Sequence, residues 1–284
     1  MNKLTSDLFP LQSEAALDWV VDLFKAQEED LRAQLTPLLA SRFTDAMYMR
    51  NSTYIDAPSA FITAFLPIVR EKCEQFMTRT INEPQHMSRF IQELLRFDER
   101  LRSELNYDGG DVKNGWRGMT YDVLQKWFDT WQAAEKQFAL ARYQEIVADA
   151  SNLQIDYDSG TDGQTRTTNA AAKVIDLFDS VTGLYQYLRS FSYKLRFLIE
   201  VQLSILDRFH NLLKDSINAY ISMTSRIGRI THGISKEDSA KLEGTGGLVS
   251  LCKVYGSADH AILELEEYSN NAVSLTHTAA LTCT

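Results

Sequence analysis

The sequence predicts an all-α chain that forms an elongated helical-rod bundle, and three observations lead to this prediction. All five prolines precede residue 85, so the last 200 residues contain none. Because an interior proline costs a helix about 3 kcal/mol, this distribution permits long helices. Apolar residues also recur every three or four positions along several segments, which is the spacing of one helix face. No segment shows the strict alternation of polar and apolar residues that is typical of a half-buried strand.

Four helices are expected in the first part of the chain, at about Ser13–Leu35, Pro37–Met49, Ser59–Ile81 and Gln85–Tyr107. The fourth carries one apolar stripe, formed by Phe90, Leu94, Phe97, Leu101 and Leu105. Glycine, asparagine and aspartate then cluster between residues 108 and 115, which is typical of a loop. This loop divides the predicted chain into two helical bundle portions, residues 1–115 and 116–284.

A long helix is expected from Thr120 to Ser151, and at 1.5 Å per residue it would extend on the order of 45 Å. Thr120 suits the N-cap position, and Asp122 lies in the first turn, where the helix dipole favours a negative charge. The apolar stripe consists of Leu124, Trp127, Trp131, Ala134, Phe138 and Ala141. We interpret Trp127 and Trp131 as core residues; the alternative is an interface anchor, a role in which tryptophan is enriched.

The second portion contains further helices, expected at about Thr168–Leu188, Ser190–Met223 and Leu248–Tyr268. The helix from Ser190 has an apolar stripe wide enough to contact two neighbours. Turn-forming residues separate these helices at 156–163 and again at 228–247.

The composition is that of a globular protein, with 44% hydrophobic and 24% charged residues. The formal net charge of −9 argues against a nucleic-acid partner, since binding to phosphates depends on lysine and arginine. It also argues against unaided docking on an anionic membrane surface. The longest apolar stretch, Phe61–Val69, is far shorter than the roughly 20 residues of a transmembrane helix. We therefore expect no transmembrane segment.

Residues that commonly hold metals are dispersed along the sequence. The three cysteines, Cys73, Cys252 and Cys283, are far apart and have no CxxC spacing. The five histidines form no HExxH pair, which is the spacing that places two imidazoles on one helix face. The segment 156–167 begins like a calcium loop but has Thr161 and Thr167 where glycine and glutamate are required. No metal site is predicted.

Catalytic and cofactor signatures are absent from the sequence as well. The glycine cluster Gly244–Gly247 lacks the GK[ST] ending of a phosphate-binding loop. Asp176 and Asp179 lie three residues apart, and we interpret them as the solvated side of an amphipathic helix. We therefore predict no catalytic residue, no cofactor-binding residue and no enzymatic activity.

Several blocks resemble the RINT/Tip family of vesicle-tethering subunits. These blocks are Phe97–Arg102 with the following Tyr107, Glu135–Ile146, Ile155–Asp158, Leu188–Ile199 and Lys253–Ala258. Each block alone is a weak signal, whereas their order and spacing together are fairly specific. The resemblance extends from about Phe61 to Glu267.

The resemblance implies a helical-rod fold of the type shared by multisubunit tethering complexes. Family members belong to the Dsl-type complex at the endoplasmic reticulum, which captures coatomer-coated vesicles returning from the Golgi and engages SNARE proteins. We accordingly expect a non-catalytic scaffold subunit in retrograde Golgi-to-endoplasmic-reticulum transport. Its expected partners are sister tethering-complex subunits and endoplasmic-reticulum SNAREs. Its expected location is cytoplasmic and peripheral on the endoplasmic reticulum membrane, with indirect membrane association.

The sequence also departs from the family, and two other interpretations stay open. The family's long N-terminal coiled region is missing, and the tail after Glu267 does not resemble the family, so we expect an internal fragment or a truncated gene product.

One alternative function is that of an unrelated all-α scaffold, such as an exocyst-like or cytoskeletal rod, which differs only in its partners. The other is an all-α enzyme whose site is assembled from residues remote in sequence.

Overall fold

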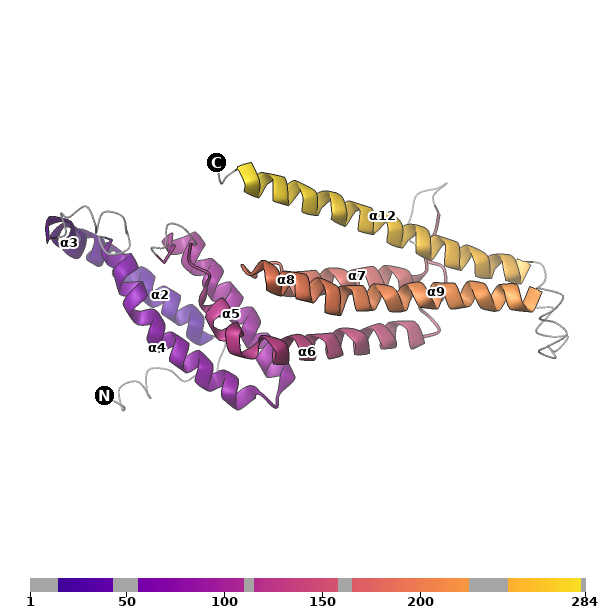
Figure 1. Cartoon of the computed structure of the whole chain (residues 1–284), viewed down its shortest axis with the longest axis horizontal. Coiled ribbons are helices and arrows are strands. Elements are labelled where there is room, and N and C mark those ends of the chain that lie inside the picture. The colour runs from indigo at the N-terminus through magenta and orange to yellow at the C-terminus, as the bar shows by residue number, and fades with distance from the viewer. Residues whose placement is uncertain (1–14, 43–55, 110–114, 158–164, 225–244, 282–284) are drawn as a thin grey trace. The chain divides into compact units, whose positions relative to one another are not determined.

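The computed structural model describes residues 15–42, 56–109, 115–157, 165–224 and 245–281 (Figure 1). Within these ranges every regular element is a helix, and the only β interaction is an isolated antiparallel bridge between Ile155 and Thr168. The predicted all-α class is confirmed. The chain forms two compact units, which we describe separately: unit 1 is Met1–Glu135 with Leu184–Phe197, and unit 2 is Lys136–Gly183 with Leu198–Thr284. The predicted division at residues 115 and 116 differs from these units and stays a prediction about the chain's organisation.

Unit 1 contains six helical elements and the first part of a seventh within its described residues. They are α2 (Ala15–Asp30), the π-helical turn η1 (Leu31–Leu35), α3 (Thr36–Arg42), α4 (Ala57–Thr80), α5 (Pro84–Leu105), α8 (Phe191–Phe197) and the beginning of α6 (Met119–Ala148). The helices predicted at Ser59–Ile81 and Gln85–Tyr107 are confirmed as α4 and α5.

The expected break before Pro37 is replaced by a π-helical turn. The Thr36 N–H donates to the Leu31 carbonyl, so the helical run continues from α2 through η1 into α3. Proline fits the first turn of a helix because its missing N–H has no partner there in any case. The helices predicted at Ser13–Leu35 and Pro37–Met49 therefore form one continuous helical run as far as Arg42. Residues 43–49 of the second predicted helix lie outside the described part.

Aromatic and aliphatic side chains join α2, α4 and α5. The Phe24 ring of α2 meets Phe61 and Phe65 of α4 edge-on, with ring centroids 5.8 Å and 5.5 Å away. The predicted stripe of α5 is buried at all five of its positions, Phe90, Leu94, Phe97, Leu101 and Leu105. Phe90 also packs on Phe76 of α4 at a centroid distance of 4.4 Å. These contacts form one end of the unit 1 core.

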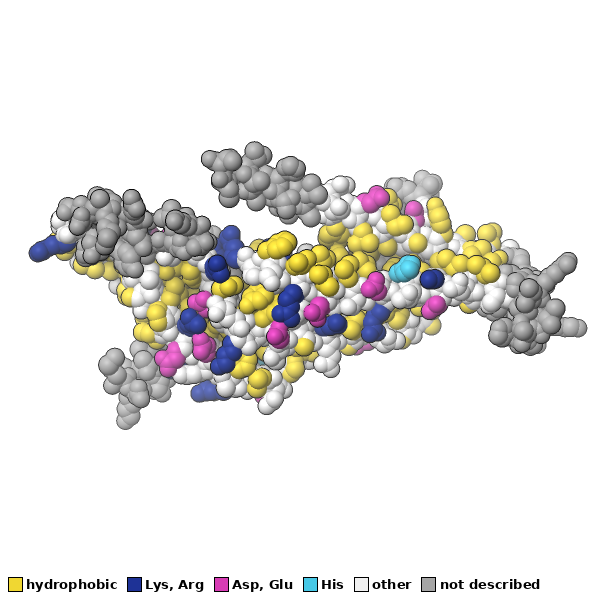
Figure 2. Space-filling model, in the orientation of Figure 1, with side chains coloured by type: hydrophobic (Ala, Val, Ile, Leu, Met, Phe, Trp, Pro, Cys, Tyr) yellow, Lys and Arg dark blue, Asp and Glu magenta, His cyan; other side chains and the backbone are white. Residues whose placement is uncertain are grey.

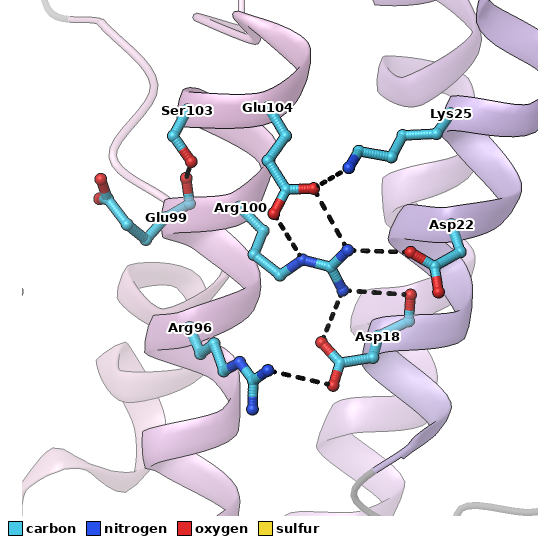
Figure 3. A network of polar contacts seen from close by, with 8 residues as sticks. All are labelled: Asp18, Asp22, Lys25, Arg96, Glu99, Arg100, Ser103 and Glu104. Carbon is cyan, nitrogen blue, oxygen red and sulfur yellow. Dashed lines mark hydrogen bonds and ion pairs between the residues drawn. The ribbon is translucent and has the colours of Figure 1, made fainter.

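An ion-pair network centred on Arg100 joins α5 to α2 (Figure 3). The Arg100 guanidinium lies 2.7 Å from an Asp18 carboxylate oxygen, 2.8 Å from Asp22 and 2.9 Å from Glu104. Glu104 also pairs with Lys25 of α2. Hydrogen bonds from Arg100 and Lys25 lower the pKa of Glu104 to about 2. One guanidinium thus holds three carboxylates, a geometry worth more than an isolated surface pair.

Replacing Arg100 by glutamine is expected to lower the free energy of unfolding of unit 1 by about 1–2 kcal/mol, because Asp18, Asp22 and Glu104 then repel one another. All four tryptophans belong to unit 1, so urea unfolding followed by tryptophan fluorescence measures this unit. Arg79→Gln is the matched control, since Arg79 is exposed and makes no ion pair within the described ranges. Equal midpoints for the two variants would contradict the importance of the network.

The other end of the unit 1 core is aromatic and lies between α6 and α8. Trp131 is fully buried against Phe197, with centroids 4.8 Å apart, and Phe128 stacks on Tyr193 at 4.0 Å. The Trp131 indole N–H donates to the Glu135 carboxylate at 2.8 Å. Trp127 is buried as well, so the interpretation of both α6 tryptophans as core residues is confirmed.

Helix α6 begins one residue before Thr120, and its cap comes from a different helix. The buried Asp98 carboxylate of α5 accepts the N–H groups of Met119 at 2.8 Å and Thr120 at 3.0 Å. Gly118, with a φ of +100°, precedes the helix, and a Cβ there would overlap the Asp98 carboxylate. The N-cap role predicted for Thr120 is therefore wrong.

Unit 2 contains the end of α6, together with α7 (Asn169–Tyr185), the π-helical turn η3 (Leu198–Gln202), α9 (Leu203–Thr224) and α12 (Thr245–Leu281). Within this unit α7, α9 and α12 run alongside one another (Figure 1). The helix predicted at Ser190–Met223 is present as the run α8, η3 and α9. Helix α12 continues well beyond its predicted end at Tyr268.

The segment before α7 holds α12 in place. The Thr168 hydroxyl accepts the Ala171 N–H at 3.2 Å, which caps α7, and lies 2.8 Å from the Ser257 hydroxyl of α12. Beside this contact the backbone of α12 passes directly over the Arg166 carbonyl at Gly256, where a Cβ would overlap that oxygen. The close approach requires glycine.

Candidate functional site

Helix α12 carries a stripe of exposed large apolar side chains, which we call the α12 stripe. Leu248, Tyr255 and Ile262 recur seven residues apart and are 61%, 66% and 56% exposed. Val249 and Leu263 are exposed beside them. Residues seven apart lie on nearly the same face of a helix, so these side chains form one continuous apolar strip.

The opposite face of α12 is apolar too and is covered by unit 2. Ala261 is buried there and Val254 and Tyr268 are only partly exposed, and the Tyr268 ring lies 5.4 Å from Phe178 of α7. This face also contacts α9. A helix that is apolar on two faces is normally buried on both. The α12 stripe is therefore a surface suited to contact with another protein.

Exposed apolar side chains continue on η3 and α9. Ile199, Leu203, Ile217 and Ile221 are each more than a third exposed. Hydrophobic side chains gather over α9 and α12 on the face shown in Figure 2. Single exposed apolar residues are normal on protein surfaces, whereas a concentration of them on one face favours an interaction site.

Unit 1 contains a different surface feature, a hollow of about 800 Å³ that we call the arginine–aromatic pocket. Its described lining residues are Arg102, Asn106, Tyr107, Asp108, Gly115, Trp116, Arg117, Tyr121, Arg189, Ser190 and Phe191. They come from the end of α5, the segment before α6, the first turn of α6, and the turn that leads into α8.

Two of the three arginines in this pocket are stacked on aromatic rings. The Arg102 guanidinium lies 4.9 Å from the centroid of Trp116 and donates a hydrogen bond to the Trp116 carbonyl at 3.2 Å. Arg117 lies 5.0 Å from the Tyr121 ring and donates to its hydroxyl at 2.9 Å. These contacts fix both guanidinium groups at the pocket wall.

Positive charge is concentrated in this pocket. Burial lowers the pKa of Arg102, and the Arg189 charge lowers it further, while the carboxylates of Asp98 and Glu99 act in the opposite direction. Arg189 is exposed and has no ion-pair partner among the described residues. The arrangement is suited to binding an anionic group, and nothing in its described lining is arranged as a nucleophile with a base.

The residues weighed as metal ligands from sequence are not brought together. His86 pairs with Glu83, His210 is exposed, and His260 lies 3.8 Å from Glu264, while His232 and His277 lie outside the described side chains. Among the described residues no group of three or more histidine, cysteine, aspartate and glutamate side chains is close enough to hold a metal ion. The segment resembling a calcium loop lies mostly outside the described ranges, at residues 158–164.

Two further residue sets considered in the sequence have ordinary environments. Asp176 and Asp179 are exposed on α7, and the pKa of Asp179 is raised by partial burial and by its neighbours Asp176 and Glu264. Burial raises the pKa of the Cys73 thiol to about 12, so this thiol stays protonated and unreactive. Both observations agree with a structural role.

Sequence analysis missed the arginine–aromatic pocket. Arg102 and Arg189 each lie within a block that carries the family resemblance, but they are 87 positions apart in the chain. Only the packing of the turn before α8 against the end of α5 brings them to one hollow. The α12 stripe, in contrast, could have been recognised from the sequence, because Leu248, Tyr255 and Ile262 repeat at a heptad spacing.

None of the helices in the described part of the chain combines the length and apolar character needed to cross a bilayer. The model of one protein family, the RINT-1/TIP-1 family, matches residues 2–281 of the chain. The match includes the tail after Glu267, so the expectation that this tail falls outside the family was wrong. No curated protein and no solved structure matches the chain significantly.

Proposed function

The chain belongs to the RINT-1/TIP-1 family, a family of tethering-complex subunits, and we propose that it is a non-catalytic scaffold acting in retrograde Golgi-to-endoplasmic-reticulum transport. In this proposal it binds sister tethering subunits and endoplasmic-reticulum SNAREs. It works in the cytoplasm, peripheral on the endoplasmic reticulum membrane, and reaches the membrane through those partners.

The observation that carries the proposal is the α12 stripe. Its exposed aliphatic and aromatic residues provide apolar area for an amphipathic helix of a sister subunit, which would complete the burial of α12. Burial of apolar surface supplies about 25 cal/mol per Å², so a few such side chains contribute substantially to binding. Family membership supports the choice of partner class, because fold alone does not assign function.

Introducing charge into the α12 stripe tests the proposal. The double variant Ile262→Asp, Leu263→Asp is expected to reduce recovery of sister subunits with the tagged full-length chain by about tenfold, since the aspartates must be desolvated in the interface. Both positions are more than half exposed, so the thermal unfolding midpoint is expected to stay within about 2 °C. The measurement is affinity purification followed by quantitative identification of co-purifying proteins.

Ser269→Asp, which adds a charge at an exposed polar position of the same helix, is the matched control and should retain full recovery. Unchanged recovery with the double variant would contradict the role of the stripe. Recovery of subunits from a different tether, or of cytoskeletal proteins, would favour the exocyst-like or cytoskeletal rod. A small-molecule turnover activity that co-purifies strictly with the chain would favour an enzyme.

A further inference from the structure

We propose that the arginine–aromatic pocket of unit 1 binds an acidic peptide segment of a partner protein, with the carboxylates of that segment paired to Arg117 and Arg189. The inference rests on the proposed function in one respect, namely that the chain's partners are proteins. It concerns a surface in unit 1 and uses no residue of the α12 stripe.

The charge of the pocket is opposite to that of the whole chain. The net charge is −9, yet the described lining contains three arginines and one carboxylate, Asp108. Burial is the main cause of the lowered pKa of Arg102, and the positive charge of Arg189 nearby lowers it further. A bound carboxylate near both guanidinium groups would remove this repulsion. An acidic segment is therefore electrostatically complementary to this hollow although the protein as a whole is acidic.

The arginine geometry suits carboxylates. A guanidinium stacked on a ring has one face covered, and its N–H groups that are not already bonded remain available as donors. Arg102 and Arg117 are both held in this way, by Trp116 and Tyr121. Side chains already fixed by stacking lose less conformational entropy when they bind a partner. Bidentate pairing with aspartate or glutamate is the preferred interaction of such groups.

The aromatic residues favour a peptide over a small inorganic anion. Phe191 is 77% exposed at the pocket and Trp116 is partly exposed, so the pocket presents apolar surface next to its charges. A volume of about 800 Å³ is much larger than a single phosphate or sulfate group and accommodates several peptide residues. A segment that combines acidic residues with one large apolar residue uses both kinds of contact.

The probe for the test is a fluorescein-labelled peptide in which a central phenylalanine is flanked on both sides by glutamates. Fluorescence anisotropy with the full chain is expected to give saturable binding that weakens as sodium chloride increases, as screened charge pairs require. Arg189→Gln and Arg117→Gln are each expected to weaken binding about tenfold. Both side chains are exposed, so neither variant should alter the unfolding midpoint.

Arg79→Gln is the matched control, because it makes the same change in net charge at an exposed site of α4 away from the pocket. It is expected to bind the probe like the unmodified chain. Equal weakening by all three variants would show non-specific attraction and overturn the proposal. A probe in which every glutamate is replaced by glutamine should bind weakly. If it binds as tightly as the acidic probe, the proposal is also overturned.

Two further outcomes complete the test. Displacement of the probe by inorganic pyrophosphate at concentrations below those of the unlabelled peptide would identify a phosphate site instead and overturn the proposal. The double variant Ile262→Asp, Leu263→Asp should leave probe affinity unchanged. If sister subunits co-purify but the probe does not bind, the inference fails alone; if the probe binds and no tethering partner co-purifies, the proposed function fails alone.

Discussion

Replacing Asp98 by alanine is expected to lower the free energy of unfolding of unit 1 by about 3 kcal/mol. The change leaves the N–H groups of Met119 and Thr120 without their acceptor in a buried place, and an unsatisfied buried donor costs about 1–3 kcal/mol. It also removes the nearest carboxylate from the partly buried Arg102. Urea unfolding followed by tryptophan fluorescence provides the measurement, since all four tryptophans lie in unit 1.

Glu99→Ala is the matched control, because Glu99 is the next residue of α5 and its side chain is exposed. This control is expected to change the free energy of unfolding by less than about 0.5 kcal/mol. If Asp98→Ala unfolded at the same urea concentration as Glu99→Ala, the capping of α6 by Asp98 would contribute nothing to the stability of unit 1. Circular dichroism of the folded variants checks that the helix content is comparable.

The same carboxylate makes the stability of unit 1 depend on pH. Burial raises the pKa of Asp98 from 3.8 to about 6, against the lowering effects of the α6 N–H groups and Arg102. A raised folded pKa means that folding favours the protonated acid, so this contribution is fully present below pH 3.8 and is lost as the pH rises through about 6. At about 1.4 kcal/mol per pH unit the loss amounts to about 3 kcal/mol.

Asp98→Asn isolates this effect, because asparagine keeps one acceptor oxygen and does not titrate. Between pH 4 and pH 7, about where the carboxyl titrates, the unmodified chain is expected to lose about 3 kcal/mol relative to the asparagine variant. Urea unfolding curves at several pH values measure the difference. Parallel pH profiles for the two proteins would show that Asp98 has an ordinary pKa.

Local sequence patterns predicted the helices of unit 1 closely. The apolar spacing of α5 identified five residues that are all buried, and the spacing around Trp127 and Trp131 located α6 to within three residues at each end. Both patterns depend on contacts within one helix and its own core face, which neighbouring residues encode directly. The stripe of α6 weakens toward its end, since Ala141 is exposed.

Features that depend on contacts between distant residues were not predictable in the same way. Thr120 has the side chain and the local context of an N-cap, yet the buried Asp98, 22 residues earlier, occupies that position in space. The arginine–aromatic pocket likewise requires that Arg102 and Arg189 meet through packing. A single sequence indicates which residues favour a structural role such as an N-cap, and tertiary packing determines which of them adopts it.

Replacing Gly256 by alanine is expected to dislodge α12 from unit 2 and to lower that unit's free energy of unfolding by about 3 kcal/mol. The new Cβ would overlap the carbonyl oxygen of Arg166, and a backbone atom cannot move aside as a flexible side chain can. Separation would also break the contact between Thr168 and Ser257. Hydrogen exchange of the α12 amides, measured by mass spectrometry, is expected to increase markedly, because an undocked helix exchanges readily.

Gly183→Ala is the control, because a Cβ at this position in α7 meets no atom within 4 Å. Alanine is favoured over glycine inside a helix, so this variant should be as stable as the unmodified chain or more stable by up to about 1 kcal/mol. Equal exchange of α12 in both variants would mean that the close approach at Gly256 does not hold the helix. Gly256 and Ser257 lie in the block Lys253–Ala258, which carries part of the family resemblance, so this docking contact gives that block a physical role. It also fixes the rotation of α12 about its own axis within unit 2, and hence the position of the α12 stripe.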